Sequence, residues 1–255
     1  MDLKNKLVLI TGATSGIGKA LSYKLAEKNC KLSLIARSAD KLETCKNELA
    51  GLTTVNTYKC DVSSRLEVNF TIDKIKEEQG LPDVAILNAG ISLRTAAVNV
   101  NPENAKEIFN VNVMGIVNFF DALAEDFKNR RNGIIAGVSS LADARGFPLS
   151  GYYAASKAAV SILLESYRIE LKRSGIKVIT VKPGFVKTAM TDKNEFYMPL
   201  LMKPEKAAEK IIKGIEREKK VIRFPWPVAA GSALIKLVPD FIFDLLMSLP
   251  LPKKK

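Results

Sequence analysis

Tyr153 and Lys157 are the residues of this chain best suited to acid–base chemistry, and they lie four positions apart. In a helix this spacing places both side chains on one face. An ammonium group beside a phenol favours the phenolate, so the pair should lower the pKa of the tyrosine from its usual value of about 10. The spacing therefore predicts that Tyr153 exchanges protons with a substrate. Tyr152 has Ser156 at the same offset and lacks such a partner.

The chain contains no histidine, which excludes Ser-His-Asp and Cys-His nucleophile systems and every histidine-ligated metal site. Its three cysteines are isolated and form neither a C-x-x-C pair nor a disulfide framework. We interpret Cys30, Cys45 and Cys60 as small buried or half-buried residues in a reducing compartment. No secretory signal is visible, so we expect a cytoplasmic protein, and we expect no metal.

The formal net charge of +12 suits an anionic ligand, an anionic membrane surface or a nucleic acid. The lysines are spread along the chain and become denser only from about Lys203. Because the sequence has neither a basic stripe interleaved with aromatic residues nor a known nucleic-acid motif, it disfavours nucleic acid as a partner.

Short apolar segments alternate with amphipathic ones, which predicts an α/β fold with a parallel sheet covered by helices on both faces. The predicted strands are Leu7–Thr11, Lys31–Ala36, Thr54–Lys59, Val84–Asn88, Gly133–Ser139 and Lys177–Lys182. The predicted helices are Gly16–Lys28, Ala39–Leu49, Arg65–Gln79, Pro102–Arg130 and Tyr152–Ser174. A chain of 255 residues fits one large domain, which we assign to residues 1–223, with residues 224–255 as an extension of different character.

A glycine-rich turn follows the first predicted strand and opens the first predicted helix. Its glycines would let the backbone turn tightly and approach a pyrophosphate, which the free N–H groups and positive dipole end of the helix attract. The predicted binding residues of this turn are Gly12, Thr14, Ser15, Gly16, Ile17 and Gly18. The spacing G-x-x-x-G-x-G departs from the usual G-x-G-x-x-G, and a tight turn that binds nothing is the alternative.

The second predicted strand ends at Ala36, where an acidic side chain would bind the adenosine ribose and repel a 2′-phosphate. Arg37 follows instead, and its fixed charge suits a phosphate. We therefore expect NADP(H) in preference to NAD(H); a solvated surface arginine is the alternative. Asp61 and Val62 follow the third predicted strand, where Asp61 could meet the adenine amino group or equally serve as a helix N-cap or turn residue.

Taken together, these residues resemble the short-chain dehydrogenase/reductase family over roughly residues 5–190. Any one of the matching segments would be weak by itself, but they agree in type and in order along the chain. The segments are the glycine-rich turn, Asn88-Ala89-Gly90, Asn112, Ser140 with Tyr153 and Lys157, and Pro183-Gly184 followed by Val186 and Thr188.

The resemblance implies a Rossmann-type fold with seven parallel strands and hydride transfer between a nicotinamide and a carbonyl/alcohol pair. By the same resemblance, Tyr153 is the general acid in reduction, and Lys157 lowers its pKa and holds the nicotinamide ribose. Ser140, thirteen residues before Tyr153, binds the substrate oxygen, and Asn112 positions a water of a proton relay. Ser139 is the competing serine. The segments at Asn88 and Pro183 imply further cofactor contacts.

Residues 185–203 are rich in apolar and aromatic side chains. In the family this segment forms a mobile substrate lid, so its apolar content indicates a small hydrophobic carbonyl or alcohol substrate, lipid-like or sterol-like. Ordinary packing or an oligomer contact is the alternative. The resemblance also implies a homodimer or homotetramer built through residues 102–130 and 152–174. A catalytically silent NADPH-binding regulator or scaffold is the alternative function.

The C-terminal region departs from the alternating pattern. We expect a basic helical segment from Lys203 to Arg223, followed by an apolar segment that contains Trp226 and closes with Lys253-Lys254-Lys255. Polar breaks at Lys236, Pro239-Asp240 and Asp244 leave it too interrupted for a membrane span. Two amphipathic helices on an anionic membrane surface, or packing against the protein's own domain or a dimer partner, are equal alternatives.

Overall fold

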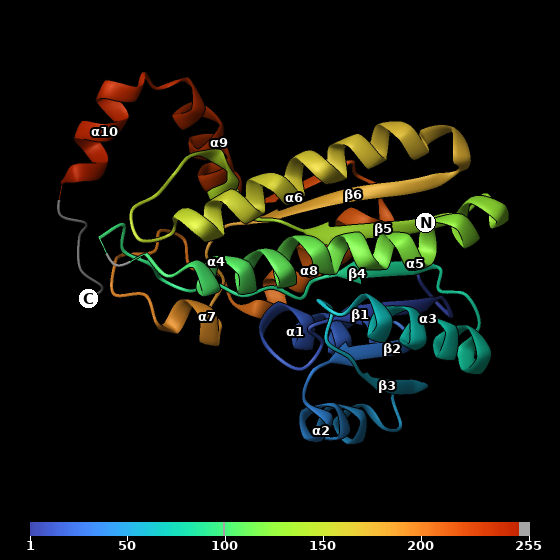
Figure 1. Ribbon diagram of the computed structural model, residues 1–255. Coiled ribbons are helices and arrows are strands. Elements are labelled where there is room, and N and C mark those ends of the chain that lie inside the picture. Colours follow the sequence, from blue (N-terminus) through green and yellow to red (C-terminus); the bar gives the residue numbers. More distant parts are fainter. Residues whose placement is uncertain (99, 250–255) are drawn as a thin grey trace.

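The protein is described by a computed structural model that covers residues 1–98 and 100–249. Within these residues, seven parallel strands form one sheet in the order β3-β2-β1-β4-β5-β6-β7 (Figure 1). The strands are β1 Leu7–Thr11, β2 Lys31–Ala36, β3 Val55–Lys59, β4 Val84–Leu87, β5 Gly133–Val138, β6 Ile176–Pro183 and β7 Val221–Phe224. This is the doubly wound arrangement that the sequence predicts, because each parallel pair needs a crossover that covers a face of the sheet.

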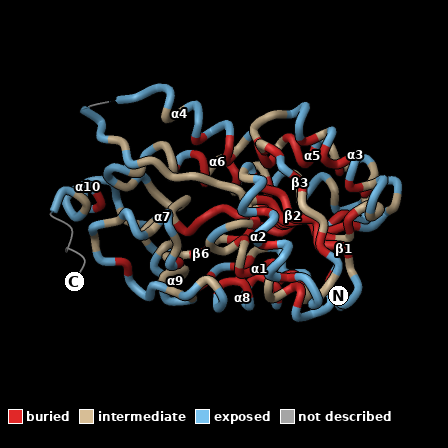
Figure 2. The backbone as a smooth tube through the Cα atoms, turned by 90° about the horizontal axis from the view of Figure 1, so that it is seen from below, coloured by how far each residue is buried: buried red, intermediate tan, exposed pale blue. Residues whose placement is uncertain are grey.

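Helices cover both faces and enclose two separate cores. The helices are α1 Gly16–Ala26, α2 Ala39–Leu49, α3 Arg65–Gln79, α4 Pro102–Phe109, α5 Gly115–Arg130, α6 Gly151–Glu170, α7 Ala189–Asp192 and α8 Pro204–Glu216. One core, with Phe119, Phe127 and Leu164, lies under α3, α5 and α6. The other, with Leu21 and Ile211, lies under α1, α2 and α8. Figure 2 shows the buried segments concentrated in the strands between these layers.

Two predicted elements differ from the observed ones. The expected basic helix to Arg223 ends at Glu216, and the last residues form β7 at the edge of the sheet. Four residues are too few to show the alternation of apolar and polar side chains that marks a strand, so the sequence pattern indicated only the lysine-rich helix. The single predicted helix over residues 102–130 is also interrupted by a π-helical turn at Asn110–Met114.

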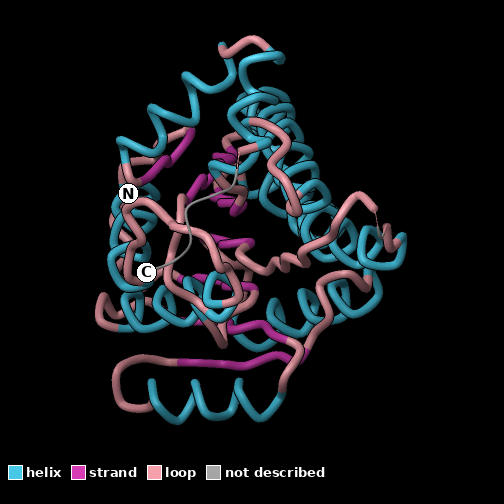
Figure 3. Tube along the Cα trace, turned by 90° about the vertical axis from the view of Figure 1, so that its left-hand side faces the viewer, coloured by secondary structure: helices cyan, strands magenta, loops and turns pink. Residues whose placement is uncertain are grey.

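The carboxyl ends of all seven strands meet at one end of the molecule, which Figure 3 views end-on with the connecting loops in front. In open parallel sheets this end is where ligands bind. A short 3-10 helix, η2 (Leu141–Ala144), directly follows β5 there, and residues 185–203 connect β6 to α8.

Two further helices, α9 (Trp226–Leu234) and α10 (Asp240–Ser248), project from this end of the protein (Figure 1). Their inner side holds the η2 region: the Ser232 hydroxyl donates to the Leu141 carbonyl at 3.0 Å, and Arg145 pairs with Asp240 at 2.7 Å. The Arg145 guanidinium also lies 4.2 Å from the centre of the Phe243 ring. This side of the extension therefore contacts its own domain, and the membrane-surface interpretation stays a prediction.

The outer side of the extension carries exposed large apolar side chains. They are Trp226, Leu234, Leu237, Phe241, Ile242, Leu245, Leu246 and Leu249. Within residues 1–98 and 100–249, no helix has the length and apolar character needed to cross a bilayer. The lysines expected to close the chain, Lys253–Lys255, lie outside the described residues.

Candidate active site

The glycine-rich turn sits at the end of β1, under the N-terminus of α1. Gly12 and Gly16 have φ of +64° and +51°, a conformation that side-chain-bearing residues rarely adopt. A Cβ on Gly18 would stand 2.1 Å from the Gly12 carbonyl oxygen, so only glycine permits this close approach. The Ser15 side chain makes no capping hydrogen bond at the start of α1. The turn thus presents a helix N-terminus and a hydroxyl, which fits a phosphate-bearing ligand.

Thr11 joins this turn to the end of β4. Its hydroxyl oxygen accepts from the backbone N–H groups of Asn88 and Ala89, both at 3.0 Å. The Asn88 side-chain amide donates back to the carbonyls of Thr11 at 3.1 Å and Gly12 at 3.4 Å. The segment Asn88-Ala89-Gly90 is therefore held against the glycine turn. Sequence reasoning missed the bracing role of Thr11, although the polar residue ending an apolar strand was its signal.

Tyr153 and Lys157 lie on α6, and Ser140 follows β5 directly, so the crossover between two neighbouring strands brings them together. Lys157 is 4% exposed and donates from Nζ to the Val138 carbonyl at 2.9 Å. Its Nζ lies 5.8 Å from the centre of the Tyr153 ring. Ser140 is buried and caps η2 by accepting from the Ala142 N–H at 3.1 Å.

The electrostatics of this cluster differ from the expectation. Burial raises the pKa of Tyr153, and a hydrogen bond with Ser140 opposes that rise. Burial lowers the pKa of Lys157 to about 8. Lys157 Nζ donates to a carbonyl and lies against the ring, and burial is the main cause that sets the pKa of Tyr153 here, so its lowering by Lys157 stays a prediction. The hydrogen bond with Ser140 favours the phenolate of Tyr153.

Ser139 and Ser140 are adjacent but have different surroundings. The Ser139 hydroxyl donates to the Lys157 carbonyl at 2.8 Å and lies 2.8 Å from the Ser161 hydroxyl, so α6 engages it. Ser140 instead acts on Tyr153. This difference favours Ser140 as the serine that faces the reacting group, which remains a prediction.

Asn112 lies in the π-helical turn and is fully buried. Its Oδ1 accepts from the Ile91 N–H at 2.8 Å, and its Nδ2 donates to the Ile91 carbonyl and the Ser156 hydroxyl, both at 3.0 Å. The side chain therefore ties the segment after β4 to α6, beside Lys157. A π-turn widens a helix locally, which is how one side chain faces two elements here. The predicted water of a proton relay remains a prediction.

Three of the expected adenosine contacts lie outside this cluster. Arg37 is exposed after β2. Asp61 Oδ1 accepts from the Ser63 N–H at 2.9 Å and the Ser63 hydroxyl at 2.7 Å, so the turn interpretation describes it well. Val62 is buried against Gly115, where a Cβ would come within 2.9 Å of its side chain.

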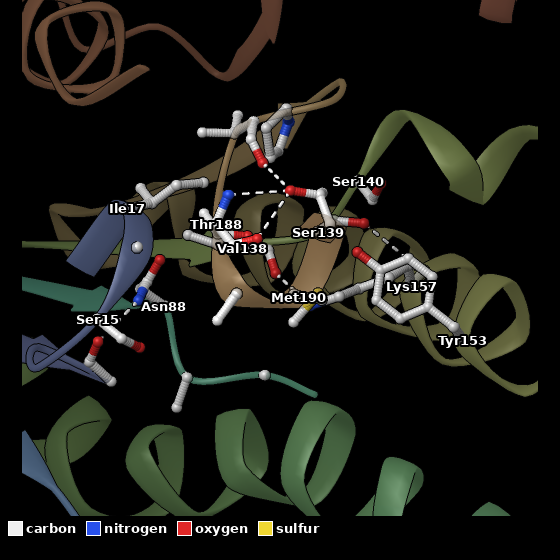
Figure 4. Close-up of a pocket in the computed structure, with 18 of the residues that line it drawn as sticks. Ser15, Ile17, Asn88, Val138, Ser139, Ser140, Tyr153, Lys157, Thr188 and Met190 are labelled. Carbon is white, nitrogen blue, oxygen red and sulfur yellow. Dashed lines mark hydrogen bonds between the residues drawn. The ribbon is translucent and has the colours of Figure 1, made fainter. Parts of the chain in front are cut away.

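A cavity of about 190 Å³ unites most of the predicted residues (Figure 4). Ser15, Ile17 and Asn88 lie at one end of this view, and Ser139, Ser140, Tyr153 and Lys157 at the other. The predicted residues that line it are Gly12, Ser15, Gly16, Ile17, Asn88, Ala89, Gly90, Ser140, Tyr153, Lys157, Pro183, Gly184, Val186 and Thr188. Thr14, Gly18, Arg37, Asp61, Val62 and Asn112 are not among its lining residues.

Five further residues line the cavity, of which sequence reasoning missed Val138, while Ser139 was the competing serine and Ala189, Met190 and Thr191 lie within the predicted lid. Thr188 and Thr191 form a capping box that begins α7 and closes this side of the cavity. Their spacing, a Thr three residues before a second hydroxyl residue, was a readable but weak signal. The arrangement can hold a phosphate-bearing ligand at the glycine turn and can exchange a proton through Tyr153.

Comparison with known proteins gives a consistent result. Residues 6–196 match the family described as short chain dehydrogenase. An uncharacterized oxidoreductase of Myxococcus xanthus is 33% identical, with 95% of this chain and 96% of that protein covered. The 3-oxoacyl-[acyl-carrier-protein] reductase FabG of Thermotoga maritima is 32% identical, with 94% and 93% covered.

Solved structures agree. An alcohol dehydrogenase from the archaeon Thermococcus sibiricus, complexed with 5-hydroxy-NADP, is 28% identical with a TM-score of 0.77, over 86% of this chain and 94% of the other. A short chain dehydrogenase/reductase from Burkholderia phymatum, in complex with NAD, has a TM-score of 0.84 with both chains fully covered. At 22% identity, the second likeness concerns the fold alone.

Proposed function

The chain belongs to the short chain dehydrogenase family, and we propose that it is an NADPH-dependent reductase that converts a hydrophobic ketone into a secondary alcohol. One observation carries this proposal: Ser140, Tyr153 and Lys157 line the same cavity as the glycine-rich turn. A nicotinamide dinucleotide held between the two would supply a hydride to a carbonyl carbon.

The residues of the chain then handle the proton and the charge. As the carbonyl C=O π bond breaks, the oxygen gains negative charge, which a hydrogen bond from Ser140 stabilises. Tyr153 gives its proton to that oxygen and becomes a phenolate. Because burial raises the pKa of Tyr153, the phenol is the resting form, which suits a general acid in reduction. The Lys157 ammonium, close to the ring, stabilises the phenolate that remains.

The cofactor residues follow from the cavity and the turn. Gly12, Ser15 and the N-terminus of α1 would hold the pyrophosphate. Pro183-Gly184 and Thr188 would lie against the nicotinamide end, near Lys157, which would hold the ribose.

For cofactor choice, Arg37 after β2 favours NADP(H) over NAD(H), since a guanidinium suits a 2′-phosphate. The Thermococcus sibiricus relative was solved with an NADP derivative, which agrees with this choice. The variant Arg37→Asp should lower the ratio of kcat/KM with NADPH to kcat/KM with NADH by at least about tenfold. A charge contact between a guanidinium and a phosphate contributes more than about 1.4 kcal/mol. An unchanged ratio would show that Arg37 is a solvated surface residue.

The substrate proposal rests on the apolar side chains of residues 185–203. Phe185 packs edge-on against Phe196 at 5.8 Å between ring centres, and Met190 lines the cavity. The Thermotoga maritima relative is named as a 3-oxoacyl reductase, which agrees with an acyl or similar lipid-like carbonyl. The domain assignment of 1–223, with residues 185–203 as lid, belongs to this proposal.

The partners proposed here are a second copy of the chain and an anionic membrane surface. On α6, Ile162 and Ile169 are 70% and 69% exposed and share one helical face, which suits a homodimer or homotetramer. The outer side of α9 and α10 is apolar, with Lys236 beside it, which suits anionic lipid for a protein that works in the cytoplasm.

The test of the proposed function is NADPH and NADH oxidation by the purified protein against a panel of ketones of graded apolarity. We expect turnover with long-chain 3-oxoacyl thioesters or steroid ketones, and its loss in Tyr153→Phe. Tight NADPH binding without turnover on any carbonyl would instead indicate the regulator or scaffold.

A further inference from the structure

A buried ion pair lies behind the candidate active site, and the proposed reaction does not use it. Asp143 in η2 has a side chain that is 3% exposed, and Lys182 near the end of β6 has one that is 13% exposed. The Lys182 ammonium contacts Asp143 Oδ2 directly. The Ser161 hydroxyl of α6 donates to the same carboxylate oxygen at 2.5 Å. One carboxylate therefore joins three elements.

Stability alone is a weak explanation for such a pair. Removing two charges from water costs about as much free energy as their attraction returns, and an apolar pair of similar volume often serves as well. What an ion pair adds to an apolar contact is direction, because the carboxylate oxygen fixes where the ammonium and the hydroxyl must lie. The elements that it holds are therefore the informative observation.

Each of the three elements carries a group of the candidate active site. Ser140 is the N-cap of η2, and the Asp143 N–H donates to the Ser140 carbonyl at 3.3 Å. Lys182 immediately precedes the Pro183-Gly184 wall of the cavity. Ser161 lies one turn after Lys157 on α6.

A 3-10 helix of four residues has little stability of its own, so external contacts must fix its position. On its inner side, those contacts include the ones that Asp143 makes with Lys182 and Ser161, beside the buried Leu141 side chain. A shift of η2 would move Ser140 with it, because the Ser140 hydroxyl bonds within the same turn to the Ala142 N–H.

We infer that Asp143 and Lys182 are positioning residues that hold Ser140 at its working distance from Tyr153. The inference rests on the proposed function only for the role of Ser140 in the reaction. Neither residue touches the cavity, so both act through η2 and β6.

The test uses three variants of the full-length chain: Asp143→Asn, Lys182→Met and the double variant. Lys177→Met is the matched control, because Lys177 lies on the same strand and pairs with Glu218 at 2.6 Å, but its side chain is 44% exposed. Four quantities are measured: kcat, the KM for NADPH with the best ketone, the midpoint of thermal unfolding, and hydrogen exchange of the peptide 139–147.

We expect each single variant to lower kcat by at least about tenfold, since small misplacements of a catalytic group cost this much or more. The KM for NADPH should stay within about twofold, because the glycine turn is untouched. Exchange in peptide 139–147 should rise in both single variants and stay unchanged in Lys177→Met. The double variant should regain thermal stability, because no unpaired charge is buried, yet keep the low kcat and the fast exchange.

Two results would overturn the inference. If the double variant regains kcat together with stability, the pair is only structural. If exchange in peptide 139–147 is unchanged in the single variants, the pair does not hold η2. Should the wild-type protein reduce no carbonyl, the proposed function fails, and hydrogen exchange by itself still decides whether Asp143 and Lys182 fix the turn at Ser140.

Discussion

At the scale of single residues, the cluster around Tyr153 works through burial more than through a neighbouring charge. Burial favours the neutral forms of both Tyr153 and Lys157, because it raises the pKa of Tyr153 and lowers that of Lys157 to about 8. The raised pKa keeps Tyr153 in its phenol form, and the hydrogen bond with Ser140 opposes that rise.

Substitution of each of the two adjacent serines should distinguish a catalytic role from a structural one. We expect Ser140→Ala to lower kcat by about a hundredfold or more, because a donor to the developing oxyanion is lost. Ser139→Ala removes a hydroxyl that α6 engages, and should lower the free energy of unfolding by about 1 kcal/mol while most of kcat remains. Steady-state kinetics and chemical denaturation measure both. A larger loss of kcat in Ser139→Ala would reverse the assignment.

Lys157 gives a prediction for stability against pH. Its pKa is about 8 in the folded protein and about 10.4 when unfolded, so above pH 8 the unfolded chain binds more protons. The free energy of unfolding therefore rises with pH in this window, and the cost of burying the ammonium is present in full below it.

From pH 8 to pH 9.5, wild type should gain about 2 kcal/mol of stability relative to Lys157→Met, at about 1.36 kcal/mol for each pH unit. Urea denaturation of both proteins at three pH values measures the difference. Wild type and Lys157→Met share every other titratable group, so the pH dependence of those groups cancels in the comparison. A difference that does not change with pH would mean that Lys157 titrates normally.

At the scale of elements, two departures from regular structure serve the site. The π-turn in the helix before β5 turns Asn112 toward both Ile91 and Ser156, which an α-helix of the same residues would not do. The 3-10 turn η2 has Ser140 as its N-cap and Arg145 just after its end, so the extension and the candidate active site share one small element. Movement of α9 and α10 would therefore displace η2 and, with it, Ser140.

The extension has an inner and an outer side, and substitutions on each side should affect either membrane binding or stability, but not both. Trp226→Ser with Leu237→Ser should lower the partition onto vesicles that contain phosphatidylglycerol by at least about tenfold, because each apolar side chain contributes more than 1.5 kcal/mol when buried. The thermal midpoint should stay the same, since both side chains are exposed.

Arg145→Ala should lower the thermal midpoint and leave vesicle binding unchanged. It removes contacts with Val238, Asp240 and Phe243 on the inner side of the extension. Vesicle sedimentation at low and high salt measures the binding. Equal binding by wild type and the outer-side variant would exclude the bilayer as the partner of this surface.

At the scale of the whole molecule, the sheet brings distant parts of the chain to one end. The glycine turn, the end of β4, Ser140 and Pro183 all follow strands whose carboxyl ends meet there. The extension and residues 185–203 lie at the same end of the molecule (Figures 1 and 3).

Association of two copies is expected through α5 and α6, on the far side of the sheet from α1. Ile162→Glu with Ile169→Glu should shift a dimer or tetramer to monomer, because two charges would enter an apolar contact. Sedimentation velocity measures the change. If Leu237→Glu dissociates the protein and the α6 variant does not, the extension is the interface.

Much of this protein could be predicted from its sequence, for a physical reason. Local periodicity and glycine spacing are properties of short segments, so β1 to β6, the glycine turn and the pairing of Tyr153 with Lys157 could be read directly. Other features depend on packing between segments that are far apart in the chain. They are the hydrogen bond of Ser139 to α6, the π-turn at Asn112, strand β7 and the pKa of Tyr153. Burial and hydrogen-bond partners exist only once those segments meet, and the tertiary structure alone decided them. The Asp143–Lys182 pair is the clearest case, since nothing in either residue's neighbourhood in the sequence indicates the other.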